Sequence, residues 1–446
     1  MKKRIAAWIY ILLALALCLT PGLGLLIAGP SEAGANEVPA RLPELTGRGG
    51  ELNSDYLSQL ADYAGESFYL RQELITLYAR ALALFGRSAE EDVVLGEDGW
   101  LYYADELGDY SGTAALGARE AFAAARNLAL MREYCESLGA EFLFFIAPNK
   151  SSLYPGNMPE SYPRAEGESR AELLHGELDR QGVAYLDLFG LFSSQEEALY
   201  FEHDSHWNSR GAALAADAVC SALELPGGYF SGQFGPAEAH SGDLFEMLYP
   251  AAADPETDSP PQGLSFTQGE RVRPDSITID TTGGGSGSLL MFRDSFGELL
   301  YPYLADSFAS ARFSRQTAYD LTAAAELGAD VVVVEIVERN LGWLAEYSAV
   351  FPAPERELDV SSALEGAACE LESSGQAPEG LHRVSGRLGA ACDADSPVYI
   401  ARGGAVYEAS LLSGGGFTAC LPGEGGGDYT VCWYQDGALR SAGASI

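Results

Sequence analysis

Short, continuous apolar runs alternate with stretches of helical periodicity across the middle of the chain. Such runs are typical of strands that are buried on both faces of a parallel sheet. Strands that alternate with helices predict an α/β domain with a central parallel sheet flanked by helices. The predicted strands are residues 141–148, 183–189, 288–292 and 331–337, and the predicted helices are residues 118–138, 170–181, 210–223 and a segment directly before residue 331.

The segments around this alternating region have other patterns. Residues 52–85 carry an apolar stripe at helical spacing, which predicts helical structure in this range. The stretch VVLGEDGWLYYADE, which begins at Val93, predicts two short strands around a Gly-Glu-Asp-Gly turn. Residues 225–287 are richer in glycine, proline and aspartate, and we expect an irregular insertion there.

The last part of the chain changes character again. Residues 375–446 contain short alternating runs separated by glycine clusters, a pattern that predicts a small antiparallel β domain. We therefore expect three parts. They are an N-terminal anchor or signal segment with its linker (1–36), the α/β domain (37–352), and a linker with a small C-terminal β-sandwich-like domain (353–446).

The N-terminus indicates where the protein resides. Three basic residues precede an uncharged apolar run from about Ile5 to Gly29, which is long enough to span a bilayer. Basic residues before such a run favour a cytoplasmic N-terminus and hence a membrane anchor. Cleavage as a signal peptide near Ala33-Gly34-Ala35 is the alternative. Both outcomes predict that residues 37–446 lie outside the cytoplasm.

Composition narrows the classes of partner. The formal net charge is -37, which repels phosphate backbones and argues against nucleic-acid binding. Besides the two lysines at the N-terminus, Lys150 is the only lysine. Six cysteines follow Cys18 without a C-x-x-C zinc spacing, and Cys420 with Cys432 form a hypothetical bridge across a glycine-rich turn.

Two motifs carry candidate chemistry. Ser295 directly follows the predicted strand 288–292 and precedes a helical run, at the sheet edge where open parallel sheets bind ligands. A serine nucleophile needs a histidine base that is oriented by a carboxylate. The stretch LYFEHDSHWNSRGAALAA provides both, with His206 as the base and Asp204 as the orienting group.

Structural explanations exist for each motif alone. Asp294 and Ser295 also fit an ordinary helix N-cap, and Asp204 with His206 also fit a hydrogen-bonded turn. His203 and His206 suggest a metal pair, but no third ligand is apparent in the sequence, so we predict neither a metal nor a cofactor. The occurrence of both motifs beside strands of one α/β pattern favours the catalytic interpretation.

The sequence resembles the DHHW/alginate O-acetyltransferase-like (AlgX/AlgJ-type) branch of the SGNH hydrolase superfamily. The resemblance spans roughly residues 36–342, and the Asp-x-His-Trp and Asp-Ser-Phe elements are its most specific parts. Its elements occur in the order NEVPARLPEL, FYLRQELI, LGEDGWLYY, FIAPNKSSLYP, LYFEHDSHWNSRGA, SGDLFEML, FRDSFGELLYPYL and DVVVVEIVER.

The resemblance implies an SGNH-hydrolase-like fold for residues 37–352 and a triad of Ser295, His206 and Asp204. It also implies O-acetylation of a cell-surface polysaccharide through an acetyl-serine, together with a membrane-bound O-acyltransferase partner that supplies acetyl groups. An esterase or deacetylase with the same triad is one alternative. A non-catalytic glycan-binding scaffold protein is the other.

Further site residues follow from the resemblance and from positions at strand ends. The sequence departs from the family where Ser205 replaces a histidine, and from ordinary SGNH hydrolases where Arg293 replaces a glycine. We expect the Ser295 N–H to be one oxyanion donor. The candidate substrate-binding residues are Tyr301, Lys150, Tyr154, Arg339 and Trp207. The alternatives are core packing for Tyr301 and Trp207, a salt bridge for Lys150, and a contact with Glu338 for Arg339.

Overall fold

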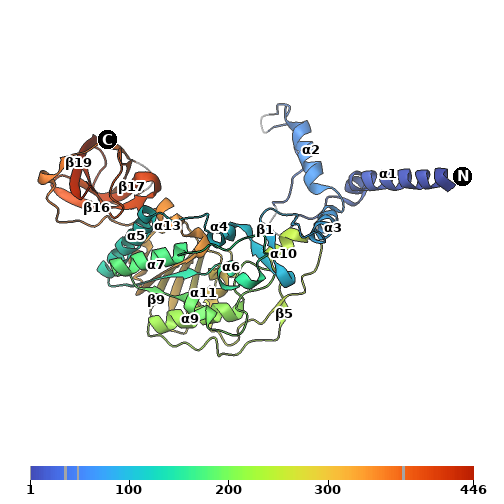
Figure 1. Ribbon diagram of the computed structural model, residues 1–446, viewed down its shortest axis with the longest axis horizontal. Helices are drawn as coiled ribbons and strands as arrows, with labels where there is room; N and C mark the ends of the chain where they lie inside the picture. Colours follow the sequence, from blue (N-terminus) through green and yellow to red (C-terminus); the bar gives the residue numbers. More distant parts are fainter. Residues whose placement is uncertain (1, 35–37, 48–49, 374–376) are drawn as a thin grey trace.

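The computed structural model describes residues 2–34, 38–47, 50–373 and 377–446. Figure 1 shows an α/β body that lies between a projecting N-terminal helix and a C-terminal β domain. The expected boundary at residues 36 and 37, and Ala35 of the possible cleavage site, lie outside the described residues.

The N-terminal part consists of α1 (Lys2–Ala28), α2 (Tyr56–Ser67) and α3 (Arg71–Ala83). Within α1, the segment Ala7–Ala28 is long and apolar enough to cross a membrane, a property that it shares with signal sequences. The helical periodicity of residues 52–85 corresponds to two helices, α2 and α3, because the helical conformation is interrupted before α3. Leu70 adopts a left-handed conformation there, with φ of 63°.

A seven-stranded sheet forms the centre of the body, in the order β4-β3-β11-β9-β10-β8-β7. The first five strands pair in parallel, whereas β8 and β7 pair antiparallel at one edge. The sheet is therefore mixed rather than wholly parallel. In this order the strands are Tyr185–Leu186, Glu141–Ala147, Val331–Val337, Ser288–Phe292, Ser310–Ser314, Thr278–Gly283 and Phe266–Gln268.

Three departures from the sequence patterns have local causes. Strand β8 lies inside the expected irregular insertion, and its sequence TIDTTG buries only alternate residues. Strand β10 (SARFS) is short and half polar, so it lacks the continuous apolar pattern. Strand β4 is much shorter than residues 183–189, because the Asp187 side chain accepts the Gly190 N–H and starts α8 (Leu188–Ser193).

Helices cover both faces of this sheet. On one face, Phe145, Met291 and Val333 pack in a core with residues of α9 (Ser209–Ala222) and α11 (Gly297–Ser307). On the other face, alternate strand residues pack with residues of other helices, two of them long and two short. Those helices are α5 (Ala118–Ser137), α7 (Arg170–Gln181), α12 (Thr322–Leu327) and α13 (Trp343–Glu346).

Smaller elements frame the edge of the sheet where the parallel strands end. The predicted hairpin is present as antiparallel strands β1 and β2, with Leu95 opposite Leu101. The short elements are β1 (Val93–Leu95), β2 (Leu101–Tyr103), α4 (Leu107–Tyr110), α6 (Lys150–Leu153), β5 (Glu238–Ala239), α10 (Asp243–Leu248) and β6 (Thr257–Asp258).

The C-terminal strands form one eight-stranded sheet, in the order β12-β19-β18-β15-β16-β17-β14-β13. Strand β16 pairs with β15 over residues 405–409 and with β17 over residues 410–412. It thereby joins two groups of strands into one sheet, whereas a β-sandwich would keep them as two separate sheets. In sequence order from β12 to β19, the strands are Leu364–Glu365, Glu370–Ser373, Leu381–Arg387, Val398–Arg402, Ala405–Leu412, Gly416–Pro422, Asp428–Gln435 and Ala438–Ser445.

The hypothetical bridge between Cys420 and Cys432 is wrong. Both thiols are buried and free, on β17 and β18. Strands β15 and β16 lie between these two strands in the sheet, which separates the two cysteines.

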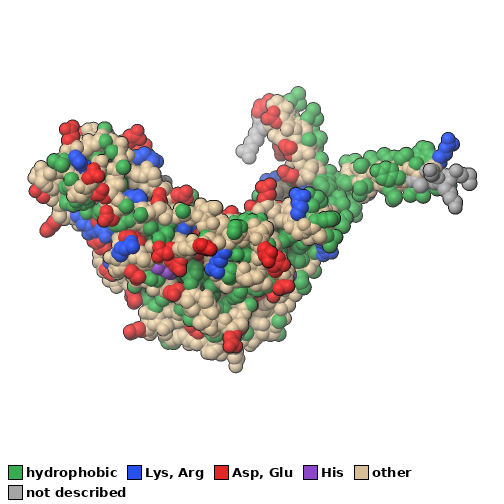
Figure 2. Space-filling model, viewed as in Figure 1, with side chains coloured by type: hydrophobic (Ala, Val, Ile, Leu, Met, Phe, Trp, Pro, Cys, Tyr) green, Lys and Arg blue, Asp and Glu red, His purple; other side chains and the backbone are tan. Residues whose placement is uncertain are grey.

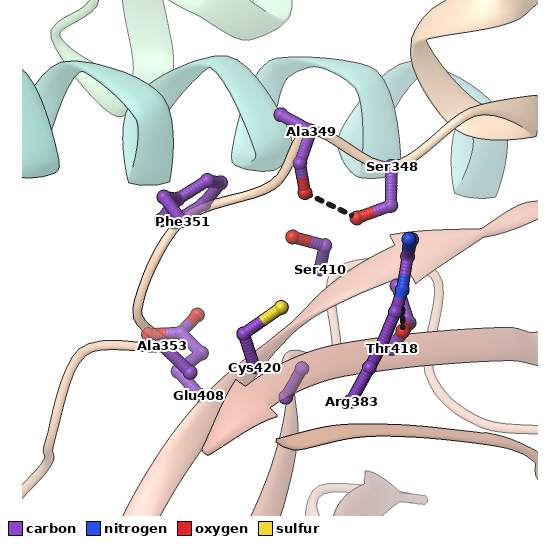
Figure 3. A pocket seen from close by; sticks show the side chains of 10 residues that line it. Ser348, Ala349, Phe351, Ala353, Arg383, Glu408, Ser410, Thr418 and Cys420 are labelled. Atoms are coloured by element: carbon purple, nitrogen blue, oxygen red, sulfur yellow. Dashed lines mark hydrogen bonds between the residues drawn. The ribbon is translucent and has the colours of Figure 1, made fainter. Parts of the chain in front are cut away.

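Helix α5 joins the C-terminal domain to the body. The buried Glu408 of β16 accepts bonds of 2.6 and 2.7 Å from Arg126 of α5, and one of 2.7 Å from Arg356. Buried Asn127 donates to the carbonyls of Leu344 and Leu411 and accepts the Leu411 N–H, each at 2.8 Å. A cavity beside Glu408 has about 10 Å³, room for no more than one water molecule (Figure 3). The interface is therefore closely packed.

We expect Asn127→Ala to destabilise the protein by roughly 2 kcal/mol or more, because buried backbone groups then lose their partner. Chemical denaturation measures this difference in the free energy of unfolding. The exposed Glu136→Ala, on the same helix, is the control and is expected to change stability by less than about 0.5 kcal/mol. Equal effects of the two variants would contradict the bridging role of Asn127.

Candidate active site

The turn that carries Ser295 is fixed by its neighbours. Asp294 accepts the Phe296 N–H at 2.9 Å and the Val337 N–H at 2.7 Å, which ties the turn to the end of β11. The buried Arg293 donates to the carbonyls of Pro274, Ser276 and Asp294. Among the described residues, no acceptor is found for the Ser295 N–H, which lies just before the start of α11.

The structure brings Ser295, His206 and Asp204 together in one hydrogen-bonded row. His206 Nε2 lies 2.8 Å from Ser295 Oγ, and His206 Nδ1 lies 2.7 Å from Asp204 Oδ1. A carboxylate at Nδ1 keeps the ring proton on that nitrogen and leaves Nε2 free to accept a proton from the hydroxyl. The arrangement is therefore able to activate Ser295 as a nucleophile.

Asp204 also binds two residues that the sequence reasoning missed. Its Oδ2 lies 3.0 Å from His240 Nε2 and accepts the Asp243 N–H at 3.2 Å. The Asp243 carboxylate accepts bonds from the Ser205 N–H and hydroxyl, and lies 3.6 Å from His206 Nδ1. The SGDLFEML motif contained the signal for Asp243, but His240 lies just outside it.

These charges set the protonation of the row. Burial opposes the charged form of Asp204, but the positive charge and hydrogen bonds of His206 and His240 hold its pKa well below the ordinary value. Burial also disfavours the His206 imidazolium. The Asp204 charge and hydrogen bond, helped by Asp243, outweigh it and raise the pKa of His206. A proton taken from Ser295 is thus stabilised on the ring.

Lys150 and Trp207 are buried beneath the triad loops and bind their backbone, and neither side chain lines the surface of the site. Lys150 is 0% exposed, and its Nζ donates to the carbonyls of Leu101, Glu202 and Asp204 at 2.6–2.9 Å. Burial lowers the pKa of Lys150 to about 8. Trp207 is also 0% exposed, and its Nε1 donates to the Phe296 carbonyl at 3.0 Å. The expected rim position of Lys150 and sugar stacking by Trp207 do not fit this burial.

The two tyrosines also have scaffold contacts. Tyr301 is 4% exposed, packs against Phe313 and donates to Gln268 at 3.2 Å. The Tyr154 hydroxyl accepts the Leu199 N–H at 2.8 Å. In the described part of the chain, neither hydroxyl forms a hydrogen bond with Ser295, His206 or Asp204. The burial and contacts of Tyr301 fit core packing rather than the expected position in a substrate pocket.

Arg339 lies close to the row. Its guanidinium is 5.5 Å from the Phe296 ring centroid, and the same ring contacts His206 at 4.8 Å. Its Nη1 lies 4.0 Å from Glu106 Oε1, and both atoms are buried without a hydrogen-bond partner among the described residues. The positive charge of Arg339 lowers the pKa of His206 and opposes part of the effect of Asp204.

Two clusters of histidine and carboxylate side chains are compact enough to hold a metal ion. The two histidines of the predicted loop belong to different clusters. His203 groups with Asp254 and Glu256, whereas His206 groups with Asp204 and Asp243. Hydrogen bonds within each group, such as 2.6 Å between His203 Nδ1 and Asp254 Oδ1, account for their closeness. His203 and His206 therefore do not form one metal pair.

A larger pocket, of about 640 Å³, opens beside the ends of β3 and β11. Asp109, Ser152, Arg170, His175 and Glu338 are among its lining residues, and no residue of the Ser-His-Asp row lines it.

Residues 93–283 match the model of the family described as SGNH hydrolase-like domain, acetyltransferase AlgX. The chain therefore contains an SGNH hydrolase-like domain. The match to this family model, together with the similarity to AlgJ proteins, agrees with the sequence resemblance to the AlgX/AlgJ-type branch. The matched segment includes Asp204 and His206 and ends before Ser295.

The chain is similar to curated relatives over part of its length. It is 25% identical over 177 residues to the probable alginate O-acetylase AlgJ of Pseudomonas syringae pv. tomato, covering 39% of this chain and 44% of the relative. The AlgJ of Azotobacter vinelandii is 25% identical over 209 residues, which cover 44% of this chain and 52% of the relative. The chain thus spans about half the length of these relatives.

Solved structures with a related arrangement are more distant. A DHHW family protein from Eubacterium siraeum is 16% identical, with a TM-score of 0.42 over 56% of this chain and 94% of its own. The O-acetyltransferase domain of Pseudomonas putida AlgJ is 20% identical, with a TM-score of 0.37 over 56% of this chain and 91% of its own.

Glu338, at the end of β11, gives the site region a pH-dependent stability. Its carboxylate accepts the Asn149 N–H at 2.9 Å and the Ser152 hydroxyl at 2.6 Å. Burial outweighs these hydrogen bonds and raises the pKa of Glu338 from 4.5 to about 7. A raised carboxyl pKa stabilises the folded state below pH 4.5, and this contribution is lost as the pH rises through 7.

We expect Glu338→Gln to match wild type near pH 4 and to exceed it in stability at pH 8. The gain is roughly 3 kcal/mol at most, from about 1.4 kcal/mol per pKa unit. The amide oxygen retains the two accepted hydrogen bonds but carries no charge. Denaturant unfolding at several pH values measures the difference, and a difference that stays constant with pH would contradict it.

Proposed function

We propose that the protein is a membrane-anchored, extracytoplasmic O-acetyltransferase that modifies a cell-surface polysaccharide. The observation that carries the proposal is the 2.8 Å contact between His206 Nε2 and Ser295 Oγ, continued by Asp204 on the other ring nitrogen. The name of the relatives, probable alginate O-acetylase, supports acetyl groups as the acyl class. The apolar helix α1 supports the anchor.

The first half of the reaction forms an acetyl-serine. Ser295 Oγ attacks the carbonyl carbon of the acetyl donor while His206 Nε2 takes the hydroxyl proton. The Ser295 N–H, which has no acceptor among the described residues, stabilises the negative oxygen that develops, because it lies beside the N-terminal end of α11. His206 then gives its proton to the leaving group, and the acetyl group remains on Ser295 as an ester.

The second half passes the acetyl group to a sugar. A sugar hydroxyl loses its proton to His206 as its oxygen attacks the ester carbon, and His206 returns the proton to Ser295 Oγ as the C–O bond breaks. Asp204 stabilises the imidazolium in both halves. Water in place of the sugar hydroxyl gives hydrolysis, which is the esterase or deacetylase alternative.

Supply of acetyl groups by a membrane-bound O-acyltransferase partner completes the proposal. Among the candidate substrate-binding residues, Arg339 retains that role best, because its charge acts on His206 and one of its nitrogens has no hydrogen-bond partner in the described part of the chain. Lys150, Trp207, Tyr154 and Tyr301 act instead by positioning the loops around the triad.

We expect Ser295→Ala to lower acetyl turnover by about 10³-fold or more, because the nucleophile is removed. Full-length protein is incubated with a chromogenic acetyl ester and candidate oligosaccharides, and both released acetate and acetylated sugar are measured. The exposed Ser193→Ala is the control and retains wild-type rates. Wild-type turnover in Ser295→Ala would overturn the triad. Glycan binding without any acetyl turnover in the wild-type protein would favour the non-catalytic scaffold, whereas acetate without acetylated sugar would favour the esterase.

The pH profile tests the charge around His206. Only the neutral ring accepts a proton, so activity rises with pH through the raised pKa of His206, above the ordinary value of about 6.5. Asp243→Asn removes a charge that favours the imidazolium, so we expect the acid limb of kcat/KM to move to lower pH. Asp280→Asn, on an exposed strand position, should leave the limb in place. An unmoved limb in Asp243→Asn would exclude this electrostatic role.

A further inference from the structure

Helix α3 buries two polar side chains and exposes two large apolar ones, Leu77 and Tyr78. Gln72, Thr76 and Ala79 are buried against the body. Thr76 Oγ1 accepts the Ala251 N–H at 3.0 Å, and Gln72 donates to the Glu32 carbonyl at 3.1 Å. A helix that packs on a hydrophobic core has the opposite orientation.

The exposed side forms a continuous apolar face. Leu77 and Tyr78 are 64% and 60% exposed, and Leu84 and Phe85, just beyond the helix end, are 85% and 80% exposed. Ala81 lies exposed between them at helical spacing. Grouped large apolar side chains on a surface indicate a contact site, whereas single ones are ordinary. We call these five residues the α3 face.

Tyr69, two residues before the start of α3, lies beside the candidate membrane span. The Tyr69 N–H donates to the Pro21 carbonyl of α1 at 3.2 Å, and the Tyr69 ring lies where a Cβ on Gly24 would clash, at 2.4 Å. Pro21 and Gly24 belong to the last two turns of the span Ala7–Ala28. Figure 2 shows apolar surface that continues from α1 onto the neighbouring segment. The start of α3 is therefore level with the end of the span.

The charge of this segment differs from that of the whole chain. Residues 68–88 contain the arginines Arg71, Arg80 and Arg87 and only one acidic residue, Glu73, although the protein has a net charge of -37. Arg80 and Arg87 are exposed. Exposed apolar and aromatic side chains next to basic ones are typical of helices that lie in the interface of a membrane with anionic lipids.

We propose that the α3 face inserts into the interfacial layer of the membrane that α1 crosses, with Arg80 and Arg87 binding anionic lipid headgroups. Lipid is the occupant that fits both the position level with the end of the span and the local positive charge. The body is then held by two membrane contacts, α1 and the α3 face, at a fixed height above the bilayer. The proposal does not depend on the enzymatic function.

Photo-crosslinking from lipid tests the proposal. The full-length chain is reconstituted into phosphatidylcholine vesicles that contain phosphatidylglycerol and a phospholipid with a diazirine in the upper acyl chain. After irradiation and digestion, mass spectrometry locates the adducts. We expect adducts on residues 77–85 as well as on α1, and none at Ile277 or Leu364, which are 65% and 52% exposed far from this segment in sequence.

Two variants separate the apolar and the electrostatic contributions, with adducts on α1 as the reference yield. Arg80→Gln with Arg87→Gln should lower adducts on residues 77–85 several-fold in vesicles with phosphatidylglycerol and change them little in phosphatidylcholine alone. Leu84→Ser with Phe85→Ser should lower them in both. All four side chains are exposed, so wild-type thermal unfolding of both variants checks that the fold is retained.

Three results would overturn the proposal. The first is adducts confined to α1, which would show that the α3 face lies away from lipid. The second is protein-to-protein crosslinks at residues 77–85 without lipid adducts, which would assign the α3 face to a second copy or to another protein. The third is an unchanged adduct yield in the arginine variant, which would remove the headgroup contact.

Discussion

The arrangement of the site depends on one buried carboxylate, that of Asp204, which is 6% exposed. An ionised group at such a depth is costly unless donors surround it. Asp204 receives the His206 N–H and ring from its own loop, and His240 and the Asp243 N–H from a second segment. The segment that looked like an irregular insertion therefore contributes to the site. It supplies His240 and the Asp243 N–H, which stabilise the Asp204 charge that orients His206.

The elements that the sequence predicted well are those with local signals. Strands β3 and β11 are mostly apolar runs, broken only by Glu141 at the start of β3 and Glu335 within β11. Helix α7 begins with the capping box of Ser169 and Glu172 and ends at Gly182 in the left-handed region. Strands β8 and β10 depend on pairing with their neighbours, β10 with β9 and β8, and β8 also with β7, which leaves no continuous apolar signal in either segment alone. The left-handed Leu70 has no signal either, because that conformation normally selects glycine.

The same division applies to the site. A serine after a buried strand and an Asp-x-His pair beside another strand were enough to predict which side chains meet. The burial of Lys150 and Trp207 was not predictable, since each is fixed by carbonyls from distant segments. In a sequence, a lone lysine and a tryptophan near a catalytic loop look like ligand contacts. In the structure, Lys150 donates to three backbone carbonyls and Trp207 donates to one, so neither side chain is available for a ligand. His240 was missed because only the fold brings it to Asp204.

The contact between α5 and β16 has a consequence for biogenesis. Asn127 and Leu411 are 284 positions apart, and Phe122 and Ala123 of α5 belong to the hydrophobic core of the C-terminal domain. Chains emerge from the ribosome from the N-terminus onward. Until β16 and the strands after it are synthesised, Phe122 and Ala123 lack their core partners and Asn127 lacks its two bonds with Leu411, so the chain is in greatest need of chaperone protection just before its synthesis is finished.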